Sequence, residues 1–406
     1  MRKISMNISI VTFITIFSFS LNTTAQNLKK VVTEAEKQTS YMLGQMSQSK
    51  EIWINDLQNK NKPEVVSPRS LSADGKLIMV PSRDWTSAFF PGVLWYLYEA
   101  TGDKNWETQA KKFTAGIEIE KLNEKTHDVG FKIYCSFGNG YRLIKDPKYR
   151  EIIIQAAKTL STRFRPITGC IRSWDHSQDK WGYPVIIDNM MNLELLFEAT
   201  RMTGDSSFYK IAVSHANTTM KNHFRPDYSS YHVIDYDTIT GKVLKKNTHQ
   251  GFSHESAWAR GQAWALYGYT MCYRETHDPK YLKQAENVAG FILNHPNLPK
   301  DLVPYWDFNA PNIPVEPRDA SAAAIISSAL YELAAYSTAG KTYRAKAGKI
   351  LQNLTDNYRA KPGEARGFIL LHSTGTKPTN LEVDVPLIYA DYYYLEALKR
   401  SNKTKK

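Results

Sequence analysis

The sequence predicts an all-α fold, a closed (α/α)6 toroid in which helical hairpins form a ring. Two observations lead to this prediction: a helix-ending turn recurs along the chain, and the segments between the turns have helical periodicity. Segments with strand-like alternation are scarce. An open α-solenoid is the alternative, and it is less favoured because the repeats are irregular and rich in long aromatic loops.

The recurring turn consists of the end of a helix, a Gly, Asp or Pro, and then an aromatic residue. It occurs at residues 102–103, 146–147, 204–205, 278–279 and 337–340. Glycine is suited to ending a helix, and Asp or Pro is suited to starting one. Each interval between turns has room for a helical hairpin and a loop, so we expect about six hairpins.

The segments between the turns are amphipathic. In one of them Tyr281, Val288 and Ile292 fall on the same helical face. The best strand candidate, residues 231–236, is expected to form a short hairpin with residues 242–244. Residues 59–69 are polar and contain prolines, so they are expected to form a loop.

The first 25 residues are interpreted as a signal peptide. Arg2 and Lys3 form a basic start, residues 8–21 are apolar, and residues 23–25 make a small-residue cleavage site. The apolar run is too short and too rich in Ser and Thr to span a bilayer. No linker divides residues 26–406, which are therefore expected to form a single toroid domain of an exported protein, periplasmic rather than secreted.

Composition narrows the class of partner. With 406 residues, 42% of them hydrophobic, the chain has enough apolar residues for a large core. The net charge of +12 favours anionic partners. The lysines are dispersed, which argues against nucleic acid and leaves an acidic polysaccharide. Three cysteines without close spacing exclude a disulfide framework and a CxxC metal site, although one bridge or free thiols are both compatible with them.

Two aspartates are the strongest catalytic candidates. Asp188 begins an otherwise apolar helix over residues 188–200, and Asp128 has a similar setting after His127. Loss of solvation raises the pKa of a carboxyl group toward the range that a general acid needs. Capping of a helix N-terminus is the ordinary role of such an aspartate, but capping does not call for a neighbouring His or Asn. Two carboxylates in this setting indicate sugar chemistry.

Aromatic residues at loop-to-helix junctions are candidates for sugar binding. Trp85, Trp174 and Trp258 are expected to stack on the apolar faces of sugar rings. Trp264 is also counted as substrate-binding, although core packing is the more ordinary role for it and for Trp95.

Three polar residues complete the candidate site. Arg260 is suited to gripping a carboxylate, because its guanidinium fork matches that group in two bonds. His232 and Gln250 are weaker candidates, and either could be structural. The sequence has no zinc-binding helix motif, GxSxG elbow or phosphate-binding glycine loop.

Taken together, these motifs resemble the unsaturated glucuronyl hydrolases, a family of glycoside hydrolases. The resemblance covers most of the mature chain, and its most specific part is the string Asp-Asn-Met-Met-Asn at residues 188–192. Further matching segments are residues 85–92, 127–131, 230–232, 249–251, 258–262, 318–322 and 389–393. Residues 88–90 are Ala-Phe-Phe where the family is expected to have Gly-Phe-Trp. This difference bears on the shape of the wall beside Trp85 and not on the chemistry.

The resemblance implies a substrate and a reaction. The substrates would be fragments left by polysaccharide lyases, glycosaminoglycan-type in particular, with an unsaturated uronic acid at the non-reducing end. The C4=C5 vinyl ether would be protonated at C4 while water adds at C5, and the resulting hemiketal would open and release the rest of the chain. No metal or organic cofactor is implied.

The resemblance also implies roles for the candidate residues. Asp188 would be the general acid and then the base that activates water. Asp128, with His127, would hold ring hydroxyls and raise the pKa of Asp188 by like charge. The other implied roles are uronate binding by Arg260 and Gln250, orientation of the ring or the water by His232, and stacking by Trp85, Trp174 and Trp258.

Three alternative functions are compatible with the sequence. An unsaturated rhamnogalacturonyl hydrolase would share the toroid and the chemistry but act on pectin- or ulvan-type fragments; His232 and Gln250 favour the glucuronyl branch. A non-catalytic glycan-binding protein could use the same scaffold. A polysaccharide lyase would need a Tyr, His or Lys base near a uronate, and the Asp-centred site fits this alternative poorly. Sulfate tolerance is expected to depend on loops around Ser173, Tyr305 and residues 372–374.

Overall fold

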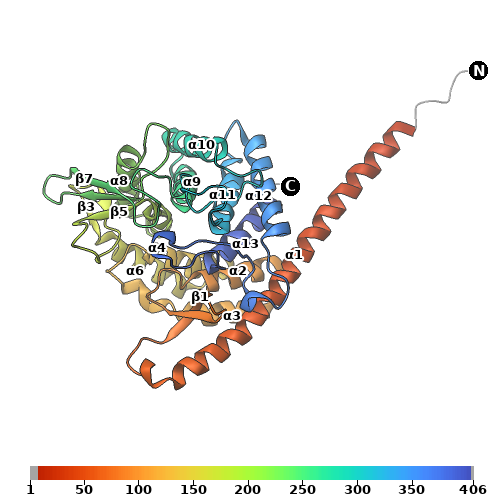
Figure 1. Ribbon diagram of the computed structural model, residues 1–406, viewed down its shortest axis with the longest axis horizontal. Coiled ribbons are helices and arrows are strands. Elements are labelled where there is room, and N and C mark those ends of the chain that lie inside the picture. The colour runs from red at the N-terminus through yellow and green to blue at the C-terminus, as the bar shows by residue number, and fades with distance from the viewer. Residues whose placement is uncertain (1–7, 404–406) are drawn as a thin grey trace, which may run out of the picture.

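The computed structural model describes residues 8–403, and the side chains of residues 28–402. Two concentric rings of helices form an (α/α)6 toroid, which confirms the predicted fold class (Figure 1). The inner ring consists of α2 (Phe89–Thr101), the continuous run α4 (Val129–Ile133), η3 (Tyr134–Gly138) and α5 (Asn139–Ile144), then α7 (Leu193–Thr203), α9 (Ala259–Thr276), α11 (Ala320–Leu333) and α13 (Ile388–Lys403). The outer ring consists of α1 (Ile8–Asn55), α3 (Lys104–Ala115), α6 (Pro147–Ser161), α8 (Ser206–Asn222), α10 (Pro279–Asn294) and α12 (Gly340–Asn357). Helix α13 packs against both α11 and α2 and so closes the inner ring.

The predicted turns separate the inner from the outer helices. Asp103, Asp146, Asp205 and Asp278 are the N-caps of α3, α6, α8 and α10, and each side chain accepts a hydrogen bond from the backbone N–H two residues later. At the fifth turn, α12 begins at Gly340 without a side-chain cap. Capping of this kind satisfies N–H groups that the helix leaves free. The recurring motif is therefore a set of helix starts, as predicted.

The loops that precede the inner helices meet at one end of the toroid, which we call the mouth. Isolated β-bridges join different loops at Thr126 with Trp174, Trp258 with Asp307, and Ser70 with Leu387, and a further bridge, Tyr305 with Arg318, lies within the loop before α11. The inner helices therefore point their N-termini toward the mouth. Because each helix N-terminus carries a partial positive charge, the mouth favours an anionic ligand.

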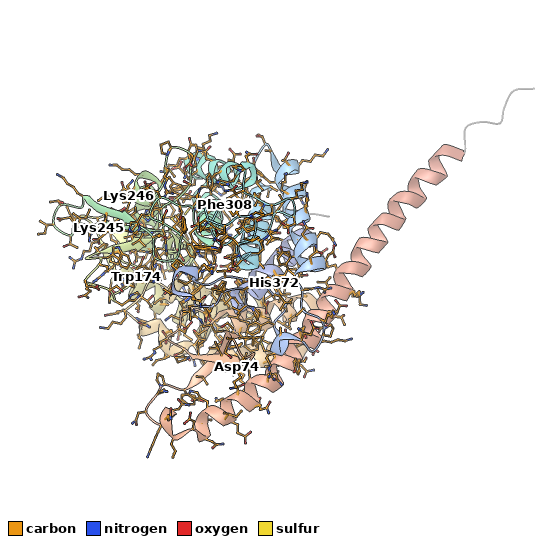
Figure 2. The ribbon with its side chains drawn as sticks, in the orientation of Figure 1. Asp74, Trp174, Lys245, Lys246, Phe308 and His372 are labelled. Carbon is orange, nitrogen blue, oxygen red and sulfur yellow. The ribbon has the colours of Figure 1, made fainter. Side chains whose placement is uncertain are left out.

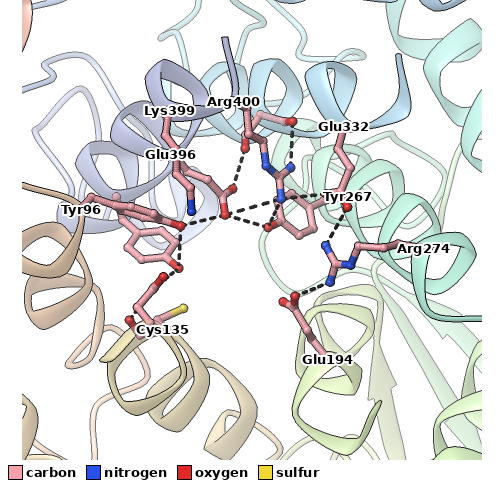
Figure 3. A network of polar contacts seen from close by, with 12 residues as sticks. Tyr96, Cys135, Glu194, Tyr267, Arg274, Glu332, Glu396, Lys399 and Arg400 are labelled. Carbon is pink, nitrogen blue, oxygen red and sulfur yellow. Dashed lines mark hydrogen bonds and ion pairs between the residues drawn. The ribbon is translucent and has the colours of Figure 1, made fainter. Parts of the chain in front are cut away.

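A network of ion pairs fills the opposite end (Figure 3). Arg274 of α9 pairs with Glu194 of α7 and with Glu332 of α11, and Arg400 of α13 also pairs with Glu332. A cavity of about 460 Å³ lies beside this network. Basic side chains near helix C-termini are stabilising, because those ends carry partial negative charge.

Short β-strands accompany the helices. The predicted hairpin is confirmed as β6 (Val233–Tyr236) paired with β7 (Val243–Asn247), and β5 (Pro184–Ile186) adds a third strand. Two further antiparallel pairs are β1 (Val65–Leu71) with β2 (Leu77–Pro81), and β3 (Phe164–Arg165) with β4 (Cys170–Ile171). The expectation of a loop over residues 59–69 was therefore wrong from Val65 onward. Register shifts in the β1–β2 pair accompany Pro68, which interrupts the alternation that would reveal a strand.

The predicted signal peptide is only partly within the described residues. Arg2 and Lys3 lie outside them, and residues 8–25 belong to α1, which projects past the body of the toroid (Figure 1). Among the helices of residues 8–403, none is long and apolar enough to cross a membrane. The three cysteines are buried free thiols.

Candidate active site

The strand pair β5–β6 brings two site residues together at the mouth. Asp188 lies in the first turn of η4 (Ile187–Asn192), directly after β5, and His232 directly precedes β6. Ile186 and Val233 are partners in the sheet, and the N–H of Ile187 donates to the carbonyl of His232 at 3.1 Å. As a result His232 Nε2 lies 3.8 Å from Asp188 Oδ2.

Asp188 is a desolvated carboxyl group rather than a helix cap. Its residue is 9% exposed, and no side-chain cap bond is made at the start of η4. Burial raises the pKa of Asp188 to about 6, against the opposing effects of His127 and Arg260. A pKa near this value suits a group that gives a proton and then takes one back.

His232 is a neutral imidazole. Its Nδ1 accepts hydrogen bonds from the backbone N–H groups of His249 and Gln250, at 3.1 and 3.2 Å. Burial lowers the pKa of His232 well below its ordinary value, with a further contribution from His249. The proton of the neutral ring is therefore on Nε2, the nitrogen that faces Asp188. Trp258 packs against the His232 ring, with centroids 4.5 Å apart and the ring planes tilted by 33°, and restrains its orientation.

Asp128 has a different environment. Its carboxylate accepts from Thr126 Oγ1 at 2.6 Å and lies 3.2 Å from His127 Nε2. Although burial opposes ionisation, His127 and these hydrogen bonds lower the pKa of Asp128 below its ordinary value. The site therefore pairs one carboxyl group that keeps its proton near pH 6 with one that is ionised.

The two predicted causes of the raised pKa of Asp188 differ in size. Loss of solvation and like charge from Asp128 were both expected to raise the pKa of Asp188, and both do so: burial is the largest cause and Asp128 the smallest. The physical reason is that the charge of Asp128 is largely compensated by its own partners, His127 and Thr126.

One close contact sets the spacing of the two aspartates. The side chain of Asn192, at the end of η4, accepts from the N–H of Phe131 in α4 at 2.8 Å. Gly130 lies against the same residue, and a Cβ on it would come within 2.5 Å of Asn192. Only glycine permits this approach, which holds the helix that follows Asp128 against the turn that carries Asp188.

The predicted stacking residues line the mouth. Trp174, buried in a loop bridged to Thr126, stacks on His176 at 5.0 Å with nearly parallel rings; Figure 2 shows it on the side of the molecule that carries the strands β5–β7. Trp258 caps α9 and is buried against His232. Trp85 is half-buried and packs against Tyr389 at 4.9 Å. Beside it, Phe89 and Phe90 are fully buried, so they form the core behind the Trp85 wall.

Arg260 does not present its fork to the mouth. The side chain is 1% exposed, and its two terminal nitrogens donate to Asp319 Oδ2 at 2.9 Å and to the carbonyls of Thr374 and Gly375 at 2.6 and 2.8 Å. The prediction that Arg260 binds a substrate carboxylate through two hydrogen bonds is therefore corrected, because Nε is the only nitrogen of this side chain that lacks a partner among the described residues. Arg260 instead fixes the loop before α13, and Gln250 Nε2 donates to the same Gly375 carbonyl at 3.1 Å.

The assignment of Trp264 as a substrate-binding residue is also corrected. It is fully buried in α9, where it packs against Phe131 and Tyr393. It belongs to the core, as does Trp95, which is equally buried. Periodicity placed both residues on helices but gave no signal that would distinguish a wall of the mouth from the layer behind it.

Two residues of the site were not assigned roles by sequence reasoning. Asp319 caps α11 and is the buried ion-pair partner of Arg260. Tyr389 lies between Trp85 and Arg260, 5.3 Å from the guanidinium carbon. Both lie in segments that carried the family resemblance, and this was the only signal that pointed to them.

Several buried polar atoms at the mouth lack hydrogen-bond partners. Within the part of the chain that the structure describes, the buried polar atoms without a hydrogen-bond partner include His127 Nδ1, Trp174 Nε1, Asp188 Oδ2, His232 Nε2 and Arg260 Nε. An unsatisfied buried polar group costs about 1–3 kcal/mol, so a ligand with many hydroxyl groups would be stabilised here. No group of three or more His, Cys, Asp or Glu side chains among the described residues could hold a metal ion.

Comparisons with known proteins identify the family of the chain. The sequence matches Glycosyl Hydrolase Family 88 over residues 43–403. It is 53% identical to an unsaturated glucuronyl hydrolase of Formosa agariphila over 91% of this chain and 93% of the relative. It is 34% identical to an unsaturated chondroitin disaccharide hydrolase of Streptococcus pyogenes serotype M1, over 83% of this chain and 86% of the relative. A crystal structure of an unsaturated glucuronyl hydrolase specific for heparin is similar with a TM-score of 0.86 and 48% identity, covering 93% of this chain and 97% of that chain.

Proposed function

The chain belongs to Glycosyl Hydrolase Family 88, and from that premise we propose that it hydrates the C4=C5 bond of the unsaturated uronic acid at the non-reducing end of lyase-generated oligosaccharides. It is a glycoside hydrolase of the unsaturated glucuronyl hydrolase class. The observation that carries the proposal is the buried pair of Asp188 Oδ2 and His232 Nε2, which face each other without other partners in the described residues.

In the proposed reaction, Asp188 donates its proton to C4 of the vinyl ether. Water adds at C5, and the Asp188 carboxylate takes the proton that this water loses, so that the acid is regenerated. The C5 hemiketal then opens and the partner sugar is released. The Nε2–H group of His232 is a hydrogen-bond donor that lies beside Asp188. It is therefore suited to holding the sugar ring or the attacking water.

The remaining groups at the mouth bind the uronate. Asp128 accepts hydrogen bonds from ring hydroxyls, and His127 forms hydrogen bonds with them. Trp174 and Trp258 provide apolar faces on which sugar rings stack. The positive ends of the inner helices attract the uronate carboxylate. Arg260 Nε is the only nitrogen of that side chain without a partner among the described residues, so Arg260 contributes to the carboxylate through charge and at most one bond.

We propose that the substrates are glycosaminoglycan-type fragments and that heparin-derived fragments are preferred among them. The support is the similarity at 48% identity to an enzyme specific for heparin, which exceeds the 34% identity to a chondroitin disaccharide hydrolase. The net charge of +12 suits acidic chains.

The test follows the near-ultraviolet absorbance of the conjugated double bond. Unsaturated disaccharides prepared by lyases from heparin, chondroitin, hyaluronan and a pectin-type polymer are each mixed with the enzyme. Loss of absorbance with release of the partner sugar is expected, fastest for the heparin disaccharide. A fastest rate on the pectin-type disaccharide would favour the rhamnogalacturonyl alternative, and a constant absorbance across the panel would reject catalysis of this kind.

We also propose that residues 1–25 direct export, on the basis of the basic start and the apolar run described above. Expression of the full chain in a bacterial host and N-terminal sequencing of the periplasmic fraction tests this. A mature protein that begins near Gln26 is expected, and an uncleaved protein confined to the cytoplasm would reject the export signal.

A further inference from the structure

The turn between β7 and α9 holds the His232 ring through its backbone. The N–H groups of His249 and Gln250 both donate to His232 Nδ1, at 3.1 and 3.2 Å, and so fix the tautomer of the ring. The six consecutive N–H groups of residues 248–253 all donate to side chains. Because these N–H groups form no helix or sheet hydrogen bonds, the shape of the turn depends on the side chains that accept from them.

Asp307 anchors this turn to the body of the toroid. Three of the accepting side chains belong to the segment between β7 and α9 itself: Thr248, His254 and Ser256. Asp307 lies in the loop before α11, and its Oδ2 accepts from the N–H of Phe252 at 2.9 Å and from Ser256 Oγ at 2.7 Å. Apart from His232 itself, Asp307 is therefore the acceptor that ties the turn to a distant part of the chain.

The carboxylate of Asp307 is itself held firmly. It is fully buried, and its Oδ1 accepts from the N–H of Asn309 at 2.9 Å. A β-bridge joins Asp307 to Trp258, the residue that packs against the His232 ring. Burial raises the pKa of Asp307, and its hydrogen bonds oppose the rise more than the charge of Arg225 does. A buried carboxylate held mainly by hydrogen bonds is costly, so its presence calls for a specific role.

Gly251 shows how closely the turn fits against this carboxylate. A Cβ on Gly251 would lie 2.7 Å from Thr248 Oγ1 and 3.1 Å from Asp307 Oδ2. Both distances are shorter than ordinary contacts of a side-chain carbon, so the turn packs directly against Asp307. A movement of the carboxylate is therefore passed on to the N–H groups of His249 and Gln250.

We propose that Asp307 is a positioning residue of the active site, which keeps two backbone N–H groups on His232 Nδ1 and thereby keeps the proton of the ring on Nε2, facing Asp188. The inference rests on the proposed function and adds to it a residue that acts through His232. Without the Asp307 carboxylate, the turn can relax and His232 can carry its proton on either nitrogen. In the other tautomer Nε2 is an acceptor, and the donor beside Asp188 is lost.

The tautomer of His232 tests the proposal directly. In protein with 15N-labelled histidines, the chemical shifts of the two ring nitrogens are well separated for one tautomer and converge when two tautomers exchange, and the His232→Phe spectrum identifies these signals. Convergence is expected in Asp307→Ala. The matched control is Asp391→Ala, because Asp391 is also buried and accepts from the N–H groups of Ile369 and Leu370, at 2.9 and 2.8 Å. It should keep the His232 signals apart. Unchanged signals in Asp307→Ala would overturn the proposal.

A double-mutant cycle tests whether Asp307 acts through His232. Asp307→Ala is expected to lower kcat by up to about 100-fold, the effect that misplacing a group at the reacting centre can have. In the His232→Phe background the same change should lower kcat no further, because the group that Asp307 positions is already absent. Equal losses of kcat in the two backgrounds would show that Asp307 only stabilises the fold, and would reject the proposal.

A milder variant decides the matter if Asp307→Ala does not fold. Ser256→Ala removes one hydrogen bond to Asp307 and the acceptor for the N–H of Ser253, so the His232 signals should converge in part and kcat should fall less. The control is Ser328→Ala, which removes a buried hydroxyl that donates to Glu396. It should change neither measurement, and a Ser256→Ala variant that behaves in the same way would contradict the proposal.

The two measurements separate this inference from the proposed reaction. If the wild-type protein turns over no unsaturated disaccharide, the reaction is rejected, yet the tautomer of His232 still decides whether Asp307 positions the ring. If the disaccharide is turned over and the His232 signals do not respond to Asp307→Ala, the reaction stands and the positioning role is rejected.

Discussion

His232 Nε2 lies 3.8 Å from Asp188 Oδ2, and neither atom has a hydrogen-bond partner within the described residues. The distance is too long for a direct hydrogen bond and leaves the two groups facing a shared space. Because Nδ1 of His232 is engaged by two backbone N–H groups, the ring presents a fixed donor to that space. A proton donor and a neutral N–H donor therefore converge where a substrate atom or a water would sit.

The first prediction concerns His232. His232→Phe keeps an aromatic ring against Trp258 but removes both nitrogens, so kcat should fall, and the two orphaned backbone N–H groups should cost about 1–3 kcal/mol of stability. Steady-state kinetics and denaturant unfolding measure the two effects. His295→Phe is the control, because His295 Nδ1 also accepts a backbone N–H, from Asn297. Equal kcat losses in both variants would show that His232 acts only on stability.

The second prediction concerns the acid itself. Asp188→Asn preserves shape and removes the transferable proton, so kcat should fall by about 10²–10⁴-fold while binding of the unsaturated disaccharide is retained. Turnover assays and calorimetry test the two parts. Asp205→Asn, which replaces one good helix cap by another, should behave as wild type. Near-full activity of Asp188→Asn would remove Asp188 from the catalytic role.

The third prediction is the pH dependence of the reaction. Burial raises the pKa of Asp188 to about 6, and the group acts as an acid only when protonated. In a pH–rate profile kcat/KM should therefore fall about tenfold per pH unit above that value. Asp128→Asn removes a negative charge that favours the protonated form of Asp188, so it should move this limb slightly to lower pH. A profile that is flat to pH 8 would contradict the assignment.

The sequence predicted the ring because its signals are local. Helix caps such as Asp103 and Asp205 act over two residues, and the apolar faces repeat every three or four, so both can be recognised without knowledge of the fold. The hairpin after His232 was equally visible. The strand from Val65 was not, because Pro68 and the register shifts interrupt its alternation.

The site was less visible because its members act through distant contacts. Asp188 could be singled out, since its desolvation arises largely from its own apolar helix. Arg260 was given the wrong contact, because its partners Asp319, Thr374 and Gly375 are 59 to 115 residues away in sequence. Sequence composition reveals an arginine's preference for carboxylates, but not that the protein supplies the carboxylate itself.

The fourth prediction follows from that correction. Arg260→Ala would leave the fully buried Asp319 without its cation, so the free energy of unfolding should fall by about 3–5 kcal/mol. Gln250→Ala loses one hydrogen bond to the same loop and should cost only about 0.5–1.5 kcal/mol. Denaturant unfolding of both variants makes the comparison. If Arg260→Ala were as stable as wild type and only raised KM, the carboxylate-gripping role would be restored.

The last prediction concerns the ion-pair network at the end opposite the mouth (Figure 3). Burial raises the pKa of Glu194 from its ordinary value of 4.5 to about 7, although its partner Arg274 opposes the shift. Between these two pH values the folded protein holds a proton that the unfolded chain has lost. The contribution of Glu194 to stability is therefore present below pH 4.5 and is lost as the pH rises through 7.

Glu194→Gln removes this titration while keeping a hydrogen-bonding side chain beside Arg274. Thermal unfolding of the variant and of the wild type is followed from pH 5 to pH 8. The melting temperature of the variant, relative to wild type, should rise across this range, because only the wild type has to ionise this half-buried carboxyl group. Glu51→Gln, at an exposed position on α1, serves as the control and should give a constant difference. A constant difference for Glu194→Gln as well would mean that Glu194 is already ionised at pH 5 and that Arg274 outweighs its burial.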